Sequence, residues 1–258
     1  MDHHQIIEYF DRIRLSYSDY QNRPCDRRLL DELHRAHQFT IPFENLDMVH
    51  GIPVSLEPSA LFDKIIRRRR GGNCFEINGL SGEFLRALGF GVRDCFSRYF
   101  RDAQGEIPFR RHRLLLVETL DGTCFWDIGI GQRSPLSTLR LLEGVVQEQR
   151  GERYRFTKEP FFGWMLWEEY QGEWLRILSF TEEPQHWVDF ITTCVWCELA
   201  PESPFHQQNI VALKTPHGRK TMDGNTFRCF EGDCVQECPD LTEEECKVLL
   251  QEEFGLVF

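Results

Sequence analysis

The stretch 67–80 constrains this chain more than any other, because it joins a basic run, two glycines, a cysteine and a helical pattern. Gly71 and Gly72 let the backbone turn sharply and approach a ligand closely. Cys74 follows, and apolar residues then recur with helical spacing, at Phe75, Leu80, Phe84, Leu85 and Leu88. A cysteine at a helix N-terminus beside arginines is favoured as thiolate, the nucleophilic form. The same pattern is compatible with a small buried hydrophobe, the usual role of a free cysteine.

The cysteines predict reduced thiols in a cytoplasmic protein, because the N-terminal residues start no secretion signal. Cys194 and Cys197 form a CxxC pair, and four more cysteines cluster later, at Cys229, Cys234, Cys238 and Cys246. A structural zinc site needs a second closely spaced pair, and the spacings within the later cluster are poor for it. We therefore expect no bound metal.

The formal net charge of -11 argues against general binding to nucleic acid or to an anionic membrane. No apolar run approaches the roughly 20 residues of a membrane span. Basic residues nevertheless cluster at 67–70, at Arg110, Arg111 and Arg113, and at Lys214, Arg219 and Lys220. Each cluster is either a local pocket for an anionic ligand, such as a phosphorylated cofactor, or a solvated face.

The pattern of apolar residues changes near residue 88, from helical spacing to short β-type runs. Helical spacing precedes that point, at 2–22, 24–40, 59–66 and 74–88. Short β-type runs separated by turn signals follow it, at 95–100, 113–119, 124–130, 154–156, 165–170 and 174–180, and they predict a small antiparallel barrel. We therefore divide the chain into a helical bundle (1–88), a barrel (89–183), a helical connector (184–200) and a last unit (201–258). In that last unit we expect short strands at 210–214, 221–222 and 226–230, then a helix after Thr242.

A thiolate nucleophile needs a base, and the base needs an orienting group. His112 stands at the start of one expected strand, and Asp127 lies on the next, beyond a turn at 121–122. Two adjacent antiparallel strands would bring these side chains together and leave one imidazole nitrogen to face Cys74. Taken singly, the histidine fits a surface position and the aspartate a turn. Together with the cysteine they predict a Cys-His-Asp triad.

These motifs resemble those of the arylamine N-acetyltransferase family. The matching segments are 70–78 (the RGGxCFExN signature), 42–46 (PFENL), 112–117 (HxLLxV), 126–131 (VDVGFG), 203–205 (SPF) and 241–256 (the closing helix). The separations between Cys74, His112 and Asp127 also fit the family. The resemblance covers essentially the whole chain.

The resemblance implies an α+β fold: an N-terminal helical bundle, a central antiparallel β-barrel and a C-terminal α/β lid, in a cysteine-protease-like arrangement. It implies that Cys74 takes the acetyl group of acetyl-CoA and passes it to an arylamine, arylhydrazine or arylhydroxylamine in a ping-pong reaction. His112 would shuttle the protons, and the Cys74 backbone N–H would bind the oxyanion. We expect no metal cofactor and no nucleic-acid or membrane partner.

The chain departs from the family at Arg111, where Thr is usual, and in the 130–132 loop, where the family has a further Phe and Gly. We expect the cofactor to contact the residues of that loop and of a basic turn: Gly131, Gln132, Lys214, Thr215, Gly218 and Arg219. We expect the aryl substrate to contact the aromatic and apolar residues Phe43, Phe125, Ile130 and Phe205. A solvated hairpin for the basic turn and ordinary core packing for Phe125 or Trp126 remain open.

Three other functions remain open. A related acyl transferase or amide synthase with another acyl donor would keep the same motifs, and Ile130 and Gln132 leave room for it. A cysteine hydrolase or transglutaminase-like enzyme would use the same triad; free CoA released only in the presence of an amine separates a transferase from it. A catalytically silent binding module would keep the fold without a reactive thiol.

Overall fold

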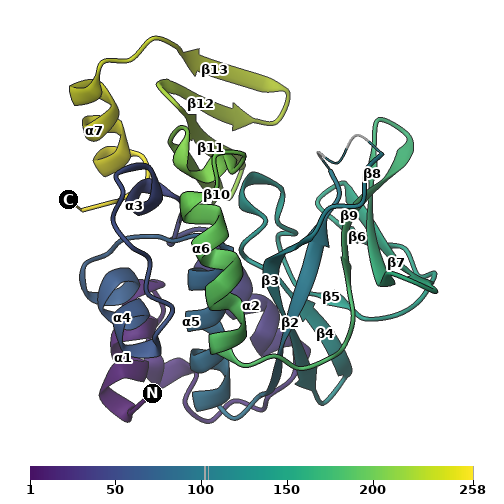
Figure 1. The fold of residues 1–258 in the computed structure, drawn as a ribbon. Helices are drawn as coiled ribbons and strands as arrows, with labels where there is room; N and C mark the ends of the chain where they lie inside the picture. The colour runs from purple at the N-terminus through teal and green to yellow at the C-terminus, as the bar shows by residue number, and fades with distance from the viewer. Residues whose placement is uncertain (102, 104, 258) are drawn as a thin grey trace.

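The computed structural model describes residues 1–101, 103 and 105–257 (Figure 1). In chain order the elements are α1 (His3–Arg12), η1 (Tyr17–Asp19), α2 (Arg27–Gln38), β1 (Phe43–Glu44), α3 (Leu46–Val49), α4 (Pro58–Phe62), η2 (Asp63–Arg67), α5 (Cys74–Ala87), β2 (Gly91–Tyr99), β3 (Arg110–Thr119), β4 (Gly122–Trp126), η3 (Gly131–Arg133), β5 (Leu139–Arg140), β6 (Gln147–Gln149), β7 (Glu152–Glu159), β8 (Gly163–Tyr170), β9 (Glu173–Phe180), η4 (Trp187–Phe190), α6 (Ile191–Leu199), η5 (Pro204–His206), β10 (Ile210–Thr215), β11 (Gly218–Asp223), β12 (Thr226–Glu231), β13 (Cys234–Cys238) and α7 (Glu243–Glu252). In the part of the chain described, every helix is too short or too polar to cross a membrane.

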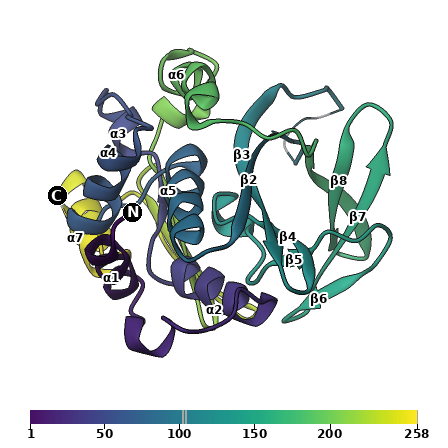
Figure 2. The ribbon, with the colours of Figure 1, turned by 90° about the horizontal axis from the view of Figure 1, so that it is seen from below.

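Helix α5 is the central helix of the N-terminal part. It lies between the other N-terminal helices and strands β2 and β3 (Figure 2). Its apolar side chains are buried as the helical spacing predicts, with Phe84 stacked on Tyr9 of α1 at 3.8 Å between ring centroids. The helix expected at 59–66 is present as α4, which continues as the π-helix η2. The first part of the chain is therefore helical, as predicted.

Eight strands form the antiparallel near-barrel that the β-type runs predict, in the order β5-β4-β3-β2-β9-β8-β7-β6. Strand β3 is buried on both faces. Leu115 and Val117 pack among the helices, whereas Leu114 and Leu116 point into the barrel, as the two-residue period of a strand requires. The edge strands β5 and β6 are joined by side chains: Gln147 exchanges two hydrogen bonds with the Arg140 backbone, at 2.7 and 2.8 Å.

Strand β4 ends at Trp126, four residues earlier than predicted. The Asp127 carboxylate accepts the backbone N–H of Gly129 at 2.8 Å, so the chain turns there and does not continue the ladder. The expected connector helix also begins later, because 187–190 form a 3₁₀ turn before α6.

The C-terminal part is an antiparallel sheet, β1-β10-β11-β12-β13, covered by α7. Strand β1 comes from the N-terminal part, where Phe43 pairs with Ala212 of β10, so this sheet connects the two ends of the chain. Strand β13 was not expected. All its residues are exposed, so it has no alternation of apolar and polar residues from which to predict a strand.

Candidate active site

Cys74 is the first residue of α5, and the residues around it define that helix start. Asn73 is the N-cap, and its side-chain oxygen accepts the N–H of Phe75 at 2.8 Å and of Glu76 at 3.4 Å. In return a Glu76 carboxylate oxygen accepts the Asn73 N–H at 2.9 Å. This reciprocal capping box places the cysteine in the first turn, at the positive end of the helix dipole.

The two glycines before Cys74 allow a close approach of backbone, not of a ligand. A Cβ on Gly71 would lie 2.1 Å from the carbonyl oxygen of Pro42. The backbone of Glu44 donates to the carbonyl of Gly72 at 3.0 Å, which fixes the loop beside β1. The expectation that these glycines admit a ligand is therefore wrong for Gly71, whose missing side chain makes room for the Pro42 backbone.

The basic run 67–70 forms ion pairs within the protein instead of a pocket for an anion. Arg70 lies 2.9 Å from the buried carboxylate of Glu44 and 3.0 Å from that of Asp47. Arg67 pairs with Glu8, and Arg68 pairs with Asp63. Arg70 therefore connects the loop before Cys74 to the 42–47 segment.

His112 reaches the site through a bulge in β3. Ser97 of β2 pairs with His112 and Arg98 pairs with Arg110, so Arg111 is the extra residue. Neighbouring residues of a regular strand point to opposite faces, and a bulge changes their direction. Arg111 and His112 accordingly both line the cavity that contains Cys74.

Asp127 is fully buried, and each of its carboxylate oxygens has partners. Oδ2 lies 2.6 Å from Nε2 of His112. Oδ1 accepts from Nδ2 of Asn78 at 2.9 Å and from the N–H of Gly129 at 2.8 Å. Asn78 lies one turn after Cys74 on α5, so the helix that carries the sulfur also orients the aspartate. Sequence reasoning gave Asn78 no role, although it belongs to the segment 70–78.

The pKa of His112 is raised to about 10. Burial alone would lower it, but the charge of Asp127 and the side chain of Cys74, which is also hydrogen-bonded to the imidazole, together outweigh burial. Since Nε2 faces Asp127, the nitrogen left for the sulfur is Nδ1. The site therefore favours a protonated imidazole between two groups that carry or develop negative charge.

Gly129 leaves no room for a side chain. A Cβ there would lie 2.7 Å from Nδ2 of Asn78, 2.8 Å from Cα of Cys74 and 2.9 Å from its Cβ. Gly129→Ala is therefore expected to displace the sulfur from the imidazole and to lower kcat/KM at least about 10-fold, since a displacement of about 1 Å at a reacting group costs up to about 100-fold. Steady-state kinetics with one arylamine, together with the melting temperature, measures the effect.

Gly82→Ala is the matched control for Gly129→Ala. It lies on the same helix as Cys74, and its nearest contact would be the flexible end of Arg86, at 3.2 Å. We expect it to keep wild-type kinetics. Unchanged kcat/KM in Gly129→Ala would show that the contact with Cys74 does not position the thiol.

The cavity beside Cys74 has a volume of about 380 Å³. Of the residues expected at a ligand, the cavity brings together Phe43, Ile130, Gly131, Gln132 and Phe205 with Cys74 and His112. Asn45 fixes the loop that carries Phe205, because its Nδ2 donates to the Phe205 carbonyl at 2.6 Å. The segments 42–46, 129–133 and 203–205, far apart in the sequence, thus meet at one opening.

The structure places Phe125 away from this cavity. Its ring packs inside the barrel against Phe156 and Phe180, at 5.6 and 5.7 Å between centroids, so the expected substrate contact is replaced by core packing. The neighbour Trp126 faces the helices, where its Nε1 donates to Ser81.

The basic turn expected at the cofactor lies beyond the cavity lining as well. Lys214 is buried with its Nζ 3.7 Å from Glu152, and a Cβ on Gly218 would lie 1.8 Å from the carbonyl oxygen of Phe230. Lys214, Thr215 and Gly218 are therefore part of the packing and pairing of the β10–β12 sheet. Arg219 lies nearer: its Nε donates to Gln132 of the cavity loop at 3.1 Å.

The cavity lining also includes Tyr99, Arg101 and Arg133, of which Arg101 was not singled out from the sequence. Arg101 and Arg133 share the carboxylate of Glu168 on β8, at 2.5 and 3.5 Å. With Arg111, which no described carboxylate neutralises, they make this wall of the cavity basic. The sequence gives little indication of this arrangement, because nothing near Arg101 or Arg133 shows that the distant Glu168 lies between them.

A family model described as N-acetyltransferase matches residues 27–258. The arylamine N-acetyltransferase / N-hydroxyarylamine O-acetyltransferase of Salmonella typhimurium is 33% identical over 229 residues, 88% of this chain and 81% of that protein. The solved structure of M. smegmatis arylamine N-acetyl transferase has a TM-score of 0.90 at 33% identity, with 99% of this chain and 92% of that one covered. Mycobacterium marinum arylamine N-acetyltransferase in complex with CoA has a TM-score of 0.88 at 29% identity, with 97% and 92% covered.

Proposed function

The chain belongs to the arylamine N-acetyltransferase family, and we propose that it acetylates arylamines from acetyl-CoA through a triad of Cys74, His112 and Asp127. The observation that supports the triad is the contact of 2.6 Å between His112 and the buried Asp127, because His112 lines the same cavity as Cys74 at the start of α5. The cysteine supplies a nucleophile, the histidine a proton relay and the aspartate its orientation.

In the first half of the reaction the Cys74 sulfur attacks the thioester carbonyl of acetyl-CoA. A new carbon–sulfur bond forms, the bond to the CoA sulfur breaks, and His112 gives its proton to the departing thiolate. The oxyanion of the tetrahedral intermediate needs an N–H donor. The Cys74 N–H is available for this, because the Asn73 cap takes the N–H groups of Phe75 and Glu76.

In the second half an amine nitrogen attacks the acetyl-cysteine. His112, now neutral, accepts the proton of the amine while the sulfur leaves as thiolate, which restores the starting state. Phe43 and Phe205, with ring centroids 6.4 Å apart at the cavity, offer apolar surface for an aromatic acceptor. An arylhydrazine or arylhydroxylamine presents the same combination of flat ring and weakly basic nitrogen.

We place the CoA side of the cavity at the 130–133 loop. Gly131 and Gln132 line the cavity, and Arg219 supports Gln132 from the C-terminal sheet. A pantetheine arm reaching Cys74 past this loop would leave the phosphates outside, near Arg219. Lys214, Thr215 and Gly218 are not part of this proposal, because they do not line the cavity beside Cys74.

Release of free CoA from acetyl-CoA is expected to depend on an arylamine. The amine renews the free thiol, whereas acetyl-cysteine shielded in the cavity hydrolyses slowly. A thiol-reactive dye that reports CoA, used with and without aniline, measures the two rates, and we expect aniline to raise turnover more than about 100-fold, the smaller end of what a positioned acid–base group contributes.

Equal CoA release without amine would indicate a hydrolase. If acetyl-CoA gave no release under any condition, a panel of longer acyl-CoA donors would test for a related transferase that uses another acyl group. Either result would contradict the proposed reaction with acetyl-CoA.

A further inference from the structure

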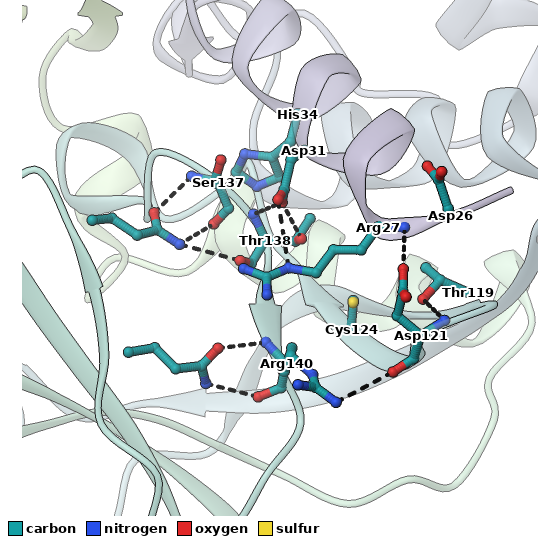
Figure 3. Close-up of polar contacts among 12 residues, drawn as sticks. Asp26, Arg27, Asp31, His34, Thr119, Asp121, Cys124, Ser137, Thr138 and Arg140 are labelled. Carbon is teal, nitrogen blue, oxygen red and sulfur yellow. Dashed lines mark hydrogen bonds and ion pairs between the residues drawn. The ribbon is translucent and has the colours of Figure 1, made fainter. Parts of the chain in front are cut away.

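A second cavity lies between α2 and the barrel, at the end of β3 that is remote from His112. Its lining consists of Arg27, Arg28, Asp31 and Arg35 of α2, Asp121 of the β3–β4 turn and Arg140 of β5, and its volume is about 550 Å³. Figure 3 shows that Arg27 and Asp31 approach from the helix and Asp121 and Arg140 from the strands. The cavity therefore gathers four guanidinium groups in a protein whose net charge is -11.

The two carboxylates of this cavity are already engaged. Oδ2 of Asp121 accepts the backbone N–H of Arg27 at 3.0 Å, and Oδ1 of Asp31 accepts the backbone N–H of Thr138 at 3.1 Å as well as its hydroxyl (Figure 3). Asp31 also approaches Nε of Arg27 at 3.5 Å. The start of α2 is capped by Asp26 and Asp121, so the helix dipole is not what would bind a ligand here.

Arg35 and Arg140 are the two arginines left without a counter-charge. Arg35 donates to the hydroxyl of Ser137 at 2.6 Å, and Arg140 donates to the carbonyl of Asp121 at 3.4 Å. Neither lies within ion-pair distance of a carboxylate among the residues that the structure describes. Arg27 and Arg28 have carboxylate partners in Asp31 and Glu32, at 3.5 and 3.4 Å, so the positive charge of this cavity that lacks a counter-charge belongs to Arg35 and Arg140. Like charges gathered in one cavity repel each other, and an anion between them removes that repulsion.

The basic cavity is separate from the catalytic one. His112 lies near the start of β3, and the turn at 120–121 lies beyond its end; at about 3.3 Å per residue the two places are more than roughly 20 Å apart along the strand. The two cavities share no lining residue among those described. The clustering of arginines in the second cavity can therefore be explained without a CoA molecule bound with its thioester at Cys74.

We propose that the α2–β5 cavity binds the phosphoryl group of a small molecule, or phosphate itself. A phosphate monoester carries between one and two negative charges at neutral pH, which matches the excess positive charge, and guanidinium groups bind phosphate oxygens in pairs. Arg35 and Arg140 come from different elements, so a phosphoryl group between them joins α2 to the barrel edge. The proposal is independent of the acetyltransferase function.

The test is titration calorimetry of the full chain at constant ionic strength, with chloride as the reference ion. Inorganic phosphate and glycerol 3-phosphate, titrated separately, distinguish a free ion from a phosphorylated metabolite. We expect one molecule bound per chain, with the affinity at least about 10-fold weaker in Arg140→Gln and in Arg35→Gln, since each variant loses one charge-assisted contact to the phosphoryl oxygens. Arg14→Gln, an exposed arginine outside the cavity, is the matched control and is expected to bind as the wild type does.

Three results would overturn the proposal. The first is the absence of binding of both probes beyond the effect of chloride. The second is unchanged affinity in both cavity variants. The third is displacement of the probe by acetyl-CoA, which would assign the anion to the catalytic cavity. Arg140 is exposed, so its variant is expected to fold even if Arg35→Gln does not; melting temperatures of all variants check this.

Discussion

Cys74→Ala is expected to abolish acetyl transfer and to prevent formation of any acetyl-enzyme. The sulfur is the only nucleophile at the start of α5, and alanine keeps the Asn73 capping box and the helix intact. Loss of a covalent nucleophile in a triad enzyme lowers kcat by about 10⁴- to 10⁶-fold. Intact-protein mass spectrometry after incubation with acetyl-CoA and no acceptor should show one added acetyl group on the wild type and none on the variant. Addition of aniline should remove the adduct from the wild type.

Cys25→Ala is the matched control for this experiment, because Cys25 is a half-buried free thiol outside the cavity. It should keep both the adduct and the activity. An adduct of the same amount on Cys74→Ala would place the acetyl group on another of the cysteines and would refute the nucleophile. A folded wild-type protein without any adduct would instead point to another acyl donor.

The arrangement of Cys74, His112 and Asp127 was predictable because it depends on local features. The cysteine lies at a helix start that consecutive residues specify. The turn at 121–122 sets β3 and β4 side by side, so His112 on β3 lies near Asp127, which directly follows β4. What the pattern could not show was the β-bulge at Arg111, which directs this residue and His112 to one cavity. A bulge depends on pairing with β2, and a single strand's sequence does not reveal it.

The surroundings of the predicted cofactor residues could not be predicted from the sequence, because charge in a sequence does not identify its partner. Lys214 lies near Glu152, and Arg219 donates a hydrogen bond to Gln132, although each partner is far away in the sequence. The arginines at the cavity, Arg101 and Arg133, are likewise organised by a glutamate on another strand. Phe125 is a different case. Side chains alternate between the two faces of a strand, so Phe125 lies on the face of β4 opposite to Cys124 and Trp126, and that face points into the barrel.

The overall architecture followed from the pattern of apolar residues wherever an element is buried. Helix α5 was predicted because its apolar residues recur at helical spacing, and β3 because it contains the continuous apolar run 114–117, which fits a strand buried on both faces. Strand β13 was missed because it is held only by its ladder to β12. The position of Asn78 between Asp127 and the backbone of Ile128 was also beyond prediction, since an asparagine in a helix has the same signature whether it faces solvent or a buried carboxylate.

Asp127→Asn is expected to lower kcat by about 10³- to 10⁴-fold, equivalent to about 4 to 5.5 kcal/mol of transition-state stabilisation. The amide oxygen would take the place of Oδ1, where Asn78 and Gly129 donate, so its NH₂ group would face Nε2 of His112. That nitrogen would then accept a hydrogen bond, and the ring proton would move to Nδ1, toward Cys74. A histidine in this tautomer has no lone pair to receive the thiol proton.

The same substitution changes the pH dependence, which a merely structural role would not do. Asp127 helps raise the pKa of His112 to about 10, so in the wild type the imidazolium persists from mildly acidic pH up to that value. Without the aspartate charge the pKa of His112 falls, and the positive charge beside the sulfur is lost at lower pH. Alkylation by iodoacetamide should therefore be fast at pH 6 in the wild type, but in Asp127→Asn it should be slow there and rise only toward alkaline pH. Asp233→Asn, an exposed turn residue, should follow the wild type. A variant at position 127 that labels and turns over like the wild type would remove the aspartate from the mechanism and leave the Cys74–His112 pair to act alone.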